Sequence, residues 1–152
     1  MNGNILMGVG NDMDGDDGAG PYAYKYASER LPEGWRAMNA ENVPENYTAV
    51  IRRERPELLA IVDAADMGLK PGEIRRIPKE KIALLTMSTH SMPLSIFMGF
   101  LEESAGRVVL VGIQADPENL EFGDELGEYM KESARKAVDM IFAGKLDEIP
   151  EV

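Results

Sequence analysis

The sequence alternates between short, almost continuous apolar runs and longer amphipathic segments. The clearest runs are residues 4–9 (NILMGV), 58–64 (LLAIVDA) and 107–114 (RVVLVGIQ). Short apolar runs bounded by glycine or charged residues are typical of strands that are buried on both faces of a sheet. These three runs therefore predict the central strands of one sheet, and the weaker pattern at 35–41 (WRAMNAE) predicts a fourth strand.

Two helices are predicted between the first three runs. Pro21 suits the first turn of a helix, because its fixed backbone angle is helical and its missing N–H needs no partner there. The following residues, YAYKYASERL, continue that helix. The segment 44–57 (PENYTAVIRRERPE) predicts a second helix, with Val50 and Ile51 toward the core and its Arg/Glu run in solvent.

Two further helices are predicted in the second half of the chain. Residues 93–105 carry apolar side chains at i, i+3, i+4 and i+7, the spacing of one helix face: Leu94, Phe97, Met98 and Leu101. Gly106 is expected to close this helix. A long final helix is predicted over 125–144, with Gly144 as its C-terminal cap.

The order of these elements predicts the fold class. Strands that alternate with helices imply an α/β fold with a mostly parallel sheet covered on both faces. The Pro71-Gly72 turn predicts that residues 73–77 (EIRRI) return as an antiparallel strand. No internal repeat and no linker-like stretch interrupts the pattern, so residues 1–152 are expected to form one domain.

Composition narrows the functional classes. The chain has 16 basic and 27 acidic residues, a net charge of −11, which disfavours binding to nucleic acid. No stretch approaches the roughly 20 apolar residues of a membrane span, so membrane insertion is not expected. The absence of cysteine excludes disulfides, thiolate nucleophiles and cysteine zinc sites. With no signal-peptide pattern at the N-terminus, we expect a cytoplasmic protein.

The loop after the first strand, GVGNDMDGDDGAG (8–20), contains four aspartates and five glycines. A phosphate-binding loop is disfavoured because the carboxylates would repel the ligand, and the dinucleotide fingerprint fails at Met13. The DMDG tetrad (12–15) imitates the signature of haloacid-dehalogenase-like phosphatases. A phosphatase that uses Asp12 or Asp14 as its nucleophile is therefore an alternative hypothesis.

Three polar features are expected at the carboxyl edge of the sheet, where open α/β folds bind their ligands. They are the acidic loop after the first strand, Asp63 at the end of the third, and Gln114 at the end of the last. His90, the only histidine, lies in the loop MSTHSMP. Each residue alone is explained by a structural role. Together, two carboxylates and one imidazole predict a metal site with open coordination positions.

Four motifs in order resemble a known family. GVGNDMDGDDGAG, IVDAADMGLKPGEIR, MSTHSMP and LVGIQAD, together with residues 43–59, are similar to the hydrogenase maturation endopeptidases. The resemblance is strongest to the branch that serves [NiFe]-hydrogenases of the hydrogenase-3, formate-hydrogenlyase type. It implies a three-layer α/β/α fold with a five-stranded mixed sheet that contains one antiparallel strand.

The resemblance also implies a function. These enzymes remove a short C-terminal extension from the precursor of the hydrogenase large subunit after nickel insertion. The family's metal-binding and catalytic trio corresponds here to Asp17, Asp63 and His90. The residues expected to contact the substrate are Asp16, Asp66, Thr89 and Gln114. A chaperone of the large subunit without catalytic activity is the second alternative hypothesis.

The ligand set predicts where the metal comes from. One histidine, two carboxylates and no sulfur make a weak site for nickel or zinc at neutral pH. We therefore expect the nickel to be supplied by the precursor, and other divalent metals to occupy the site in vitro.

Overall fold

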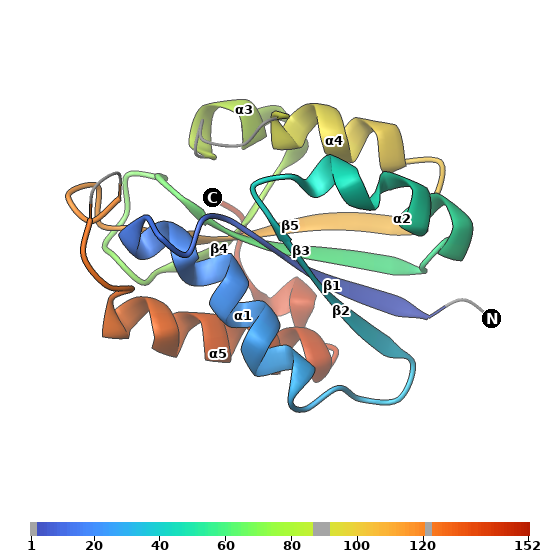
Figure 1. Cartoon of the computed structure of the whole chain (residues 1–152), viewed down its shortest axis with the longest axis horizontal. Helices are drawn as coiled ribbons and strands as arrows, with labels where there is room; N and C mark the ends of the chain where they lie inside the picture. Colours follow the sequence, from blue (N-terminus) through green and yellow to red (C-terminus); the bar gives the residue numbers. More distant parts are fainter. Residues whose placement is uncertain (1–2, 87–91, 121–122) are drawn as a thin grey trace.

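A computed structural model describes residues 3–86, 92–120 and 123–152. Five strands form one sheet in the order β2-β1-β3-β5-β4 (Figure 1). The strands are β1 (Asn4–Val9), β2 (Trp35–Glu41), β3 (Leu58–Ala65), β4 (Ile74–Ile77) and β5 (Arg107–Gln114). All neighbouring pairs are parallel except β4 and β5. The predicted mixed sheet with one antiparallel strand is therefore confirmed.

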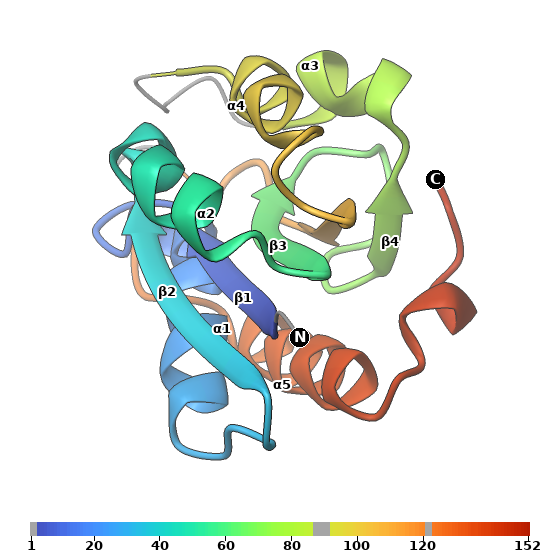
Figure 2. The same cartoon turned by 90° about the vertical axis from the view of Figure 1, so that its right-hand side faces the viewer.

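Helices cover both faces of this sheet, as Figures 1 and 2 show. One face carries α1 (Ala19–Ser28) and α5 (Glu128–Phe142). The opposite face carries α2 (Thr48–Glu54), α3 (Ile82–Leu85) and α4 (Leu94–Leu101). Each face has its own cluster of buried apolar side chains. The three-layer α/β/α prediction is confirmed.

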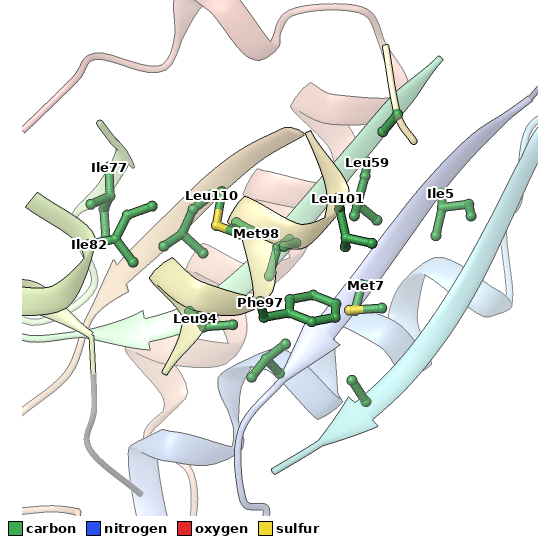
Figure 3. Close-up of a cluster of buried hydrophobic side chains, with 14 of the residues drawn as sticks. Ile5, Met7, Leu59, Ile77, Ile82, Leu94, Phe97, Met98, Leu101 and Leu110 are labelled. Atoms are coloured by element: carbon green, nitrogen blue, oxygen red, sulfur yellow. The ribbon is translucent and has the colours of Figure 1, made fainter. Parts of the chain in front are cut away.

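Helix α4 forms much of the core on its side of the sheet. All four apolar residues that its spacing predicted are buried, and Figure 3 shows Phe97 directed toward Met7 of β1. The predicted end at Gly106 was wrong, because the helix ends at Leu101. The chain then turns, with the amides of Ser104 and Ala105 both donating to the Leu101 carbonyl. Gly106 instead donates to Pro56 O and leads into β5.

The opposite cluster lies between the sheet and helices α1 and α5. Alanines form most of the buried face of α1, and α5 contributes Ala134 and Ala137 beside larger apolar residues. These small side chains let the two helices pack closely. Gly144 ends the final helix as predicted, with φ +75°. Its amide donates to Ile141 O at 3.2 Å, and Lys145 N donates to Met140 O at 2.8 Å. This pair of bonds is the Schellman arrangement.

Two segments differ from the expected helices. The predicted helix 44–57 consists of a 3₁₀ turn (Pro44–Tyr47) followed by the short α2. Arg55, which has a left-handed backbone with φ +47°, ends α2 just before Pro56. Helix α3 was not predicted, since four residues are too few to show a helical period.

The last residues of the chain run along the outer edge of β4. Arg76 N donates to Pro150 O at 2.8 Å, Val152 N donates to Arg76 O at 3.1 Å, and the Arg76 side chain donates to Ile149 O. The segment therefore covers backbone groups that an edge strand would otherwise expose. Within the described ranges, no helix is both long and apolar enough to cross a membrane.

Candidate functional site

The acidic loop, residues 10–18, connects β1 to α1 at the carboxyl edge of the sheet (Figure 1). Its four aspartates differ sharply in exposure. Asp12 is exposed and Asp14 is partly buried, whereas Asp16 and Asp17 are 0% and 2% exposed. The last two lie in a 3₁₀ turn, Gly15–Gly18, that leads directly into α1. The loop therefore turns one pair of carboxylates inward and leaves the other toward solvent.

Two glycines allow this loop to fold against the end of β1. A Cβ on Gly20, in the first turn of α1, would lie 2.0 Å from Val9 O. Gly10 has φ +141°, and a Cβ there would lie 2.1 Å from Asp17 O. Both contacts are backbone contacts that a side chain would prevent. The glycines therefore bring the turn that carries Asp17 onto the end of β1.

Asp17 is held at this position by the loop itself. Its Oδ2 accepts a 3.0 Å hydrogen bond from the amide of Asn11, and its own amide donates to Asp14 O at 3.1 Å. The turn that contains it also contacts β3. A nearly fully buried carboxylate is thus fixed beside the central strand of the sheet.

Asp63 belongs to that central strand. It is fully buried and pairs with Gly112 of β5. The expectation that it ends the strand was wrong by two residues, because β3 continues to Ala65. Since side chains alternate along a strand, Asp63 points to the same face as Ile61 and Ala65, toward α3 and α4.

His90 and Thr89 lie outside the described residues, so their placement stays a prediction. The chain on both sides of them is described. Thr86 forms an isolated bridge with Ala65, and Asp66 N donates to Leu85 O at 2.9 Å. The chain that leads to His90 therefore leaves from beside the end of β3, on the sheet face that Asp63 shares.

Within residues 3–86, 92–120 and 123–152, no group of three Asp, Glu or His side chains could hold a metal ion. The third member of the expected trio, His90, lies outside those ranges, so the trio stays a prediction. Asp17 and Asp63 supply the carboxylate oxygens expected of a site for a divalent cation. The metal-binding and catalytic roles of Asp17, Asp63 and His90 remain predictions.

Asp16 is a buried anchor between the acidic loop and the β5–α5 connection (residues 115–127). Its Oδ1 accepts from Asn119 Nδ2 at 2.9 Å and from Gly127 N at 3.1 Å. Its Oδ2 accepts from Asp116 N at 2.9 Å and from the Tyr129 hydroxyl at 2.5 Å. Four donors satisfy a carboxylate that has no contact with solvent. Its expected role in substrate binding is untested, and its observed contacts are structural.

Burial raises the pKa of Tyr129 well above its usual range, and the hydrogen bond to Asp16 raises this pKa further. The phenol therefore stays protonated and keeps donating to the carboxylate at neutral pH. Sequence patterns gave no indication of Asn119 or Tyr129 as parts of the site, because nothing in the polar segment around them marks a partner some hundred residues away.

Gln114 braces the segment that follows β3. Its Oε1 accepts from Met67 N at 2.6 Å and from Leu69 N at 3.2 Å. Its Nε2 donates to Asp66 Oδ1 at 3.2 Å and to Ala115 O at 2.7 Å. The amide is 1% exposed, so its present contacts are all within the protein. Asp66 itself is exposed. Substrate contacts of either residue are untested.

The arrangement does not favour a phosphatase that uses the DMDG tetrad. In that class the nucleophilic aspartate directly follows the strand, whereas β1 ends at Val9 and Asp12 is three residues farther along. Asp12 is exposed, and Asp14 accepts a 3.0 Å hydrogen bond from Asn11 Nδ2.

Comparisons with known proteins find related sequences and related structures. A family model of hydrogenase maturation proteases matches residues 25–144. The chain is 45% identical over 113 residues to the hydrogenase 3 maturation protease of Escherichia coli K12, covering 74% of this chain and 72% of that protein.

Two solved structures are also similar. The solution structure of the endopeptidase HycI from E. coli matches with a TM-score of 0.88 and 35% identity, covering 98% of this chain and 96% of the other. The crystal structure of the [NiFe] hydrogenase maturation protease HycI from Thermococcus kodakarensis KOD1 matches with a TM-score of 0.78 and 30% identity, over 96% and 93% of the two chains.

Proposed function

The chain belongs to the family of hydrogenase maturation proteases, and from this premise we propose which reaction it performs. It cleaves the precursor of a [NiFe]-hydrogenase large subunit and removes a C-terminal extension after nickel has been inserted. The nickel carried by the precursor is recognised through Asp17, Asp63 and His90. The reaction takes place in the cytoplasm, between soluble partners.

The observation that carries this proposal is the pair of buried carboxylates at the carboxyl edge. Asp17 is presented by a glycine-dependent turn and Asp63 by the central strand. Of the residues that flank the segment with His90, Thr86 pairs with Ala65 at the end of β3, and Met92 packs against the core on the α4 side of the sheet. Oxygen ligands of this kind bind a divalent ion while leaving positions for ligands from the precursor.

The decisive experiment incubates the purified protein with nickel-loaded large-subunit precursor and determines the mass of the product. A discrete loss of C-terminal mass is expected. Stable complex formation with no loss of mass would instead support the chaperone hypothesis. Asp17→Asn, Asp63→Asn and His90→Ala should each abolish cleavage while the variants stay folded, because each removes one ligand of three.

Asp12→Asn is the matched control. It neutralises an aspartate of the same loop whose side chain is exposed, and it should leave cleavage unchanged. Under the phosphatase hypothesis the wild-type protein would instead release phosphate from a phosphoester and leave the precursor intact, and Asp12→Asn or Asp14→Asn would lose the phosphate release. Full cleavage by His90→Ala would refute the assigned site.

The source of the metal follows from the ligand set. The chain has one histidine and no cysteine, so at neutral pH its site binds nickel or zinc weakly. The isolated protein is therefore largely free of metal, and the precursor's nickel completes the site. This makes nickel insertion the condition for cleavage.

Elemental analysis after mild chelation tests this step, together with cleavage of nickel-free and nickel-loaded precursor. We expect little bound metal and cleavage of the loaded form alone. One tightly bound metal ion per chain, combined with equal cleavage of both forms, would contradict it.

A further inference from the structure

We propose that Asn119 and Tyr129 are positioning residues that set the orientation of Asp17 through Asp16. The inference rests on the proposed function, because it assigns Asp17 to the reactive site. Neither residue belongs to the motifs that identify the family's site. Asn119 lies in the β5–α5 connection and Tyr129 in the first turn of α5, and both donate to Asp16 of the acidic loop. Figure 1 shows the connection and the acidic loop at the same end of the molecule.

The first step of the argument is the number of bonds on Asp16. Asn119 contacts it twice, through its side-chain amide at 2.9 Å and through its backbone carbonyl, which accepts from Asp16 N at 2.7 Å. The Tyr129 hydroxyl and the amides of Asp116 and Gly127 complete the set. Both the backbone and the side chain of Asp16 are therefore fixed by a segment that follows β5.

The second step is the geometry of the turn. Successive residues of a 3₁₀ turn project about 120° apart, because there are about three residues per turn. Asp16 points toward the β5–α5 connection. Asp17 therefore points away from that connection, toward Asn11, and accepts a hydrogen bond from the Asn11 amide. A rotation of the turn that altered Asp16 would move the Asp17 carboxylate as well.

The third step is that Asn119 is itself held in place. Its Oδ1 accepts from Asp124 N at 2.9 Å, and its Nδ2 also donates to Glu125 O at 3.0 Å. Asn119 thus organises its own segment and presents that segment to Asp16. The position of Asp17 depends on residues more than a hundred positions away, in a part of the chain that otherwise contributes no ligand.

Tyr129→Phe tests the inference with a minimal change, since it removes one hydroxyl and keeps the ring. We expect kcat for cleavage of the nickel-loaded precursor to fall at least about tenfold, the effect typical of losing a partner that orients a metal ligand. The affinity for Zn²⁺ alone, measured by calorimetry, should fall by a similar factor. Asn119→Ala should likewise lower both kcat and the affinity for Zn²⁺.

Tyr26→Phe is the matched control. The Tyr26 hydroxyl donates to Asp139 Oδ1 at 2.9 Å, so this variant also loses one phenol–carboxylate bond, but between α1 and α5. It should retain the wild-type kcat and Zn²⁺ affinity. Comparable losses in Tyr26→Phe would show a general structural effect and overturn the inference.

Wild-type kcat and Zn²⁺ affinity in folded Tyr129→Phe would also overturn the inference. The two proposals can fail separately. If the wild-type protein leaves the loaded precursor intact, the proposed function fails, and the Zn²⁺ measurements on the variants still decide whether Asn119 and Tyr129 position Asp17.

Discussion

Two connections leave the carboxyl edge of the sheet close to Asp63, and they are held in different ways. The acidic loop packs backbone against backbone at Gly10 and Gly20. Asp16 accepts three hydrogen bonds from the β5–α5 connection and a fourth from Tyr129 of α5. In the β3–β4 connection, residues 66–73, the first amides are held by one side chain: Gln114 Oε1 accepts hydrogen bonds from Met67 N and Leu69 N.

The difference shows how the two connections respond to substitution. Close backbone packing leaves no space for a side chain, so the acidic loop should not tolerate substitution of Gly10 or Gly20. At Asp16 the loss of any one donor still leaves several hydrogen bonds. The β3–β4 connection has open space at Gly68. The Gln114 side chain holds its first amides, and separate hydrogen bonds at Asp66 and Gly72 hold its two ends. The candidate ligand Asp17 lies in the connection with close backbone packing, as expected of a side chain that must be held accurately.

The largest expected effect is that of Gly20→Ala. The added Cβ would lie 2.0 Å from Val9 O and 2.5 Å from Val9 N, so the start of α1 would have to move away from β1. We expect the free energy of unfolding to fall by about 3 kcal/mol or more, in the upper range for overpacked sites. Urea unfolding measures this change.

Gly99→Ala is the control for helical propensity. Gly99 also lies in a helix, α4, but no atom lies within 4 Å of an added Cβ. This substitution should raise the free energy of unfolding by about 0.5–1 kcal/mol, because alanine favours helices. If both variants changed stability in the same direction, the close backbone approach at the acidic loop would not be the limiting feature.

The second prediction concerns Gln114, whose side chain holds the first amides of the β3–β4 connection. Gln114→Ala should lower the free energy of unfolding by about 1–3 kcal/mol, because buried amides lose their acceptor. Hydrogen exchange should accelerate at the amides of Met67 and Leu69, while Asn11 N stays protected. Equal acceleration at all three amides would show that the two connections are held as one unit.

The strands were easier to predict from the sequence than the connections between them. The bounds of β1 and β5 agree with their apolar runs, because strands buried on both faces have a continuous apolar pattern. Asp63 was expected to end its strand, although β3 continues to Ala65, because the short alanine side chains carry too little apolar surface to mark a strand end. The mostly parallel sheet and the bounds of its strongly apolar strands were therefore predictable, while the end of β3 and the ends of several helices were not.

At the site, the sequence predicted residues but not their supports. The order of the strands is enough to place Asp17 and Asp63 at one edge of the sheet. The burial of Asp16 depends on donors at Asn119, in a polar segment without periodicity, and at Tyr129, in the first turn of α5. Long-range hydrogen bonds of this kind leave no local pattern, so only the structure distinguishes Asp16 from Asp17.

The smallest effect concerns the protonation of Tyr129 beside the acidic loop. Its pKa is raised above the ordinary value of about 10 by burial and by the bond to Asp16. The stabilisation that depends on the protonated phenol is therefore complete below about pH 10 and is lost as the pH rises toward the raised pKa. The difference in unfolding free energy between wild type and Tyr129→Phe should accordingly shrink from pH 8 to pH 11. Absorbance at 295 nm should show one late-ionising tyrosine that the variant lacks. A constant stability difference across this range would mean that the hydroxyl does not stabilise the acidic loop through Asp16.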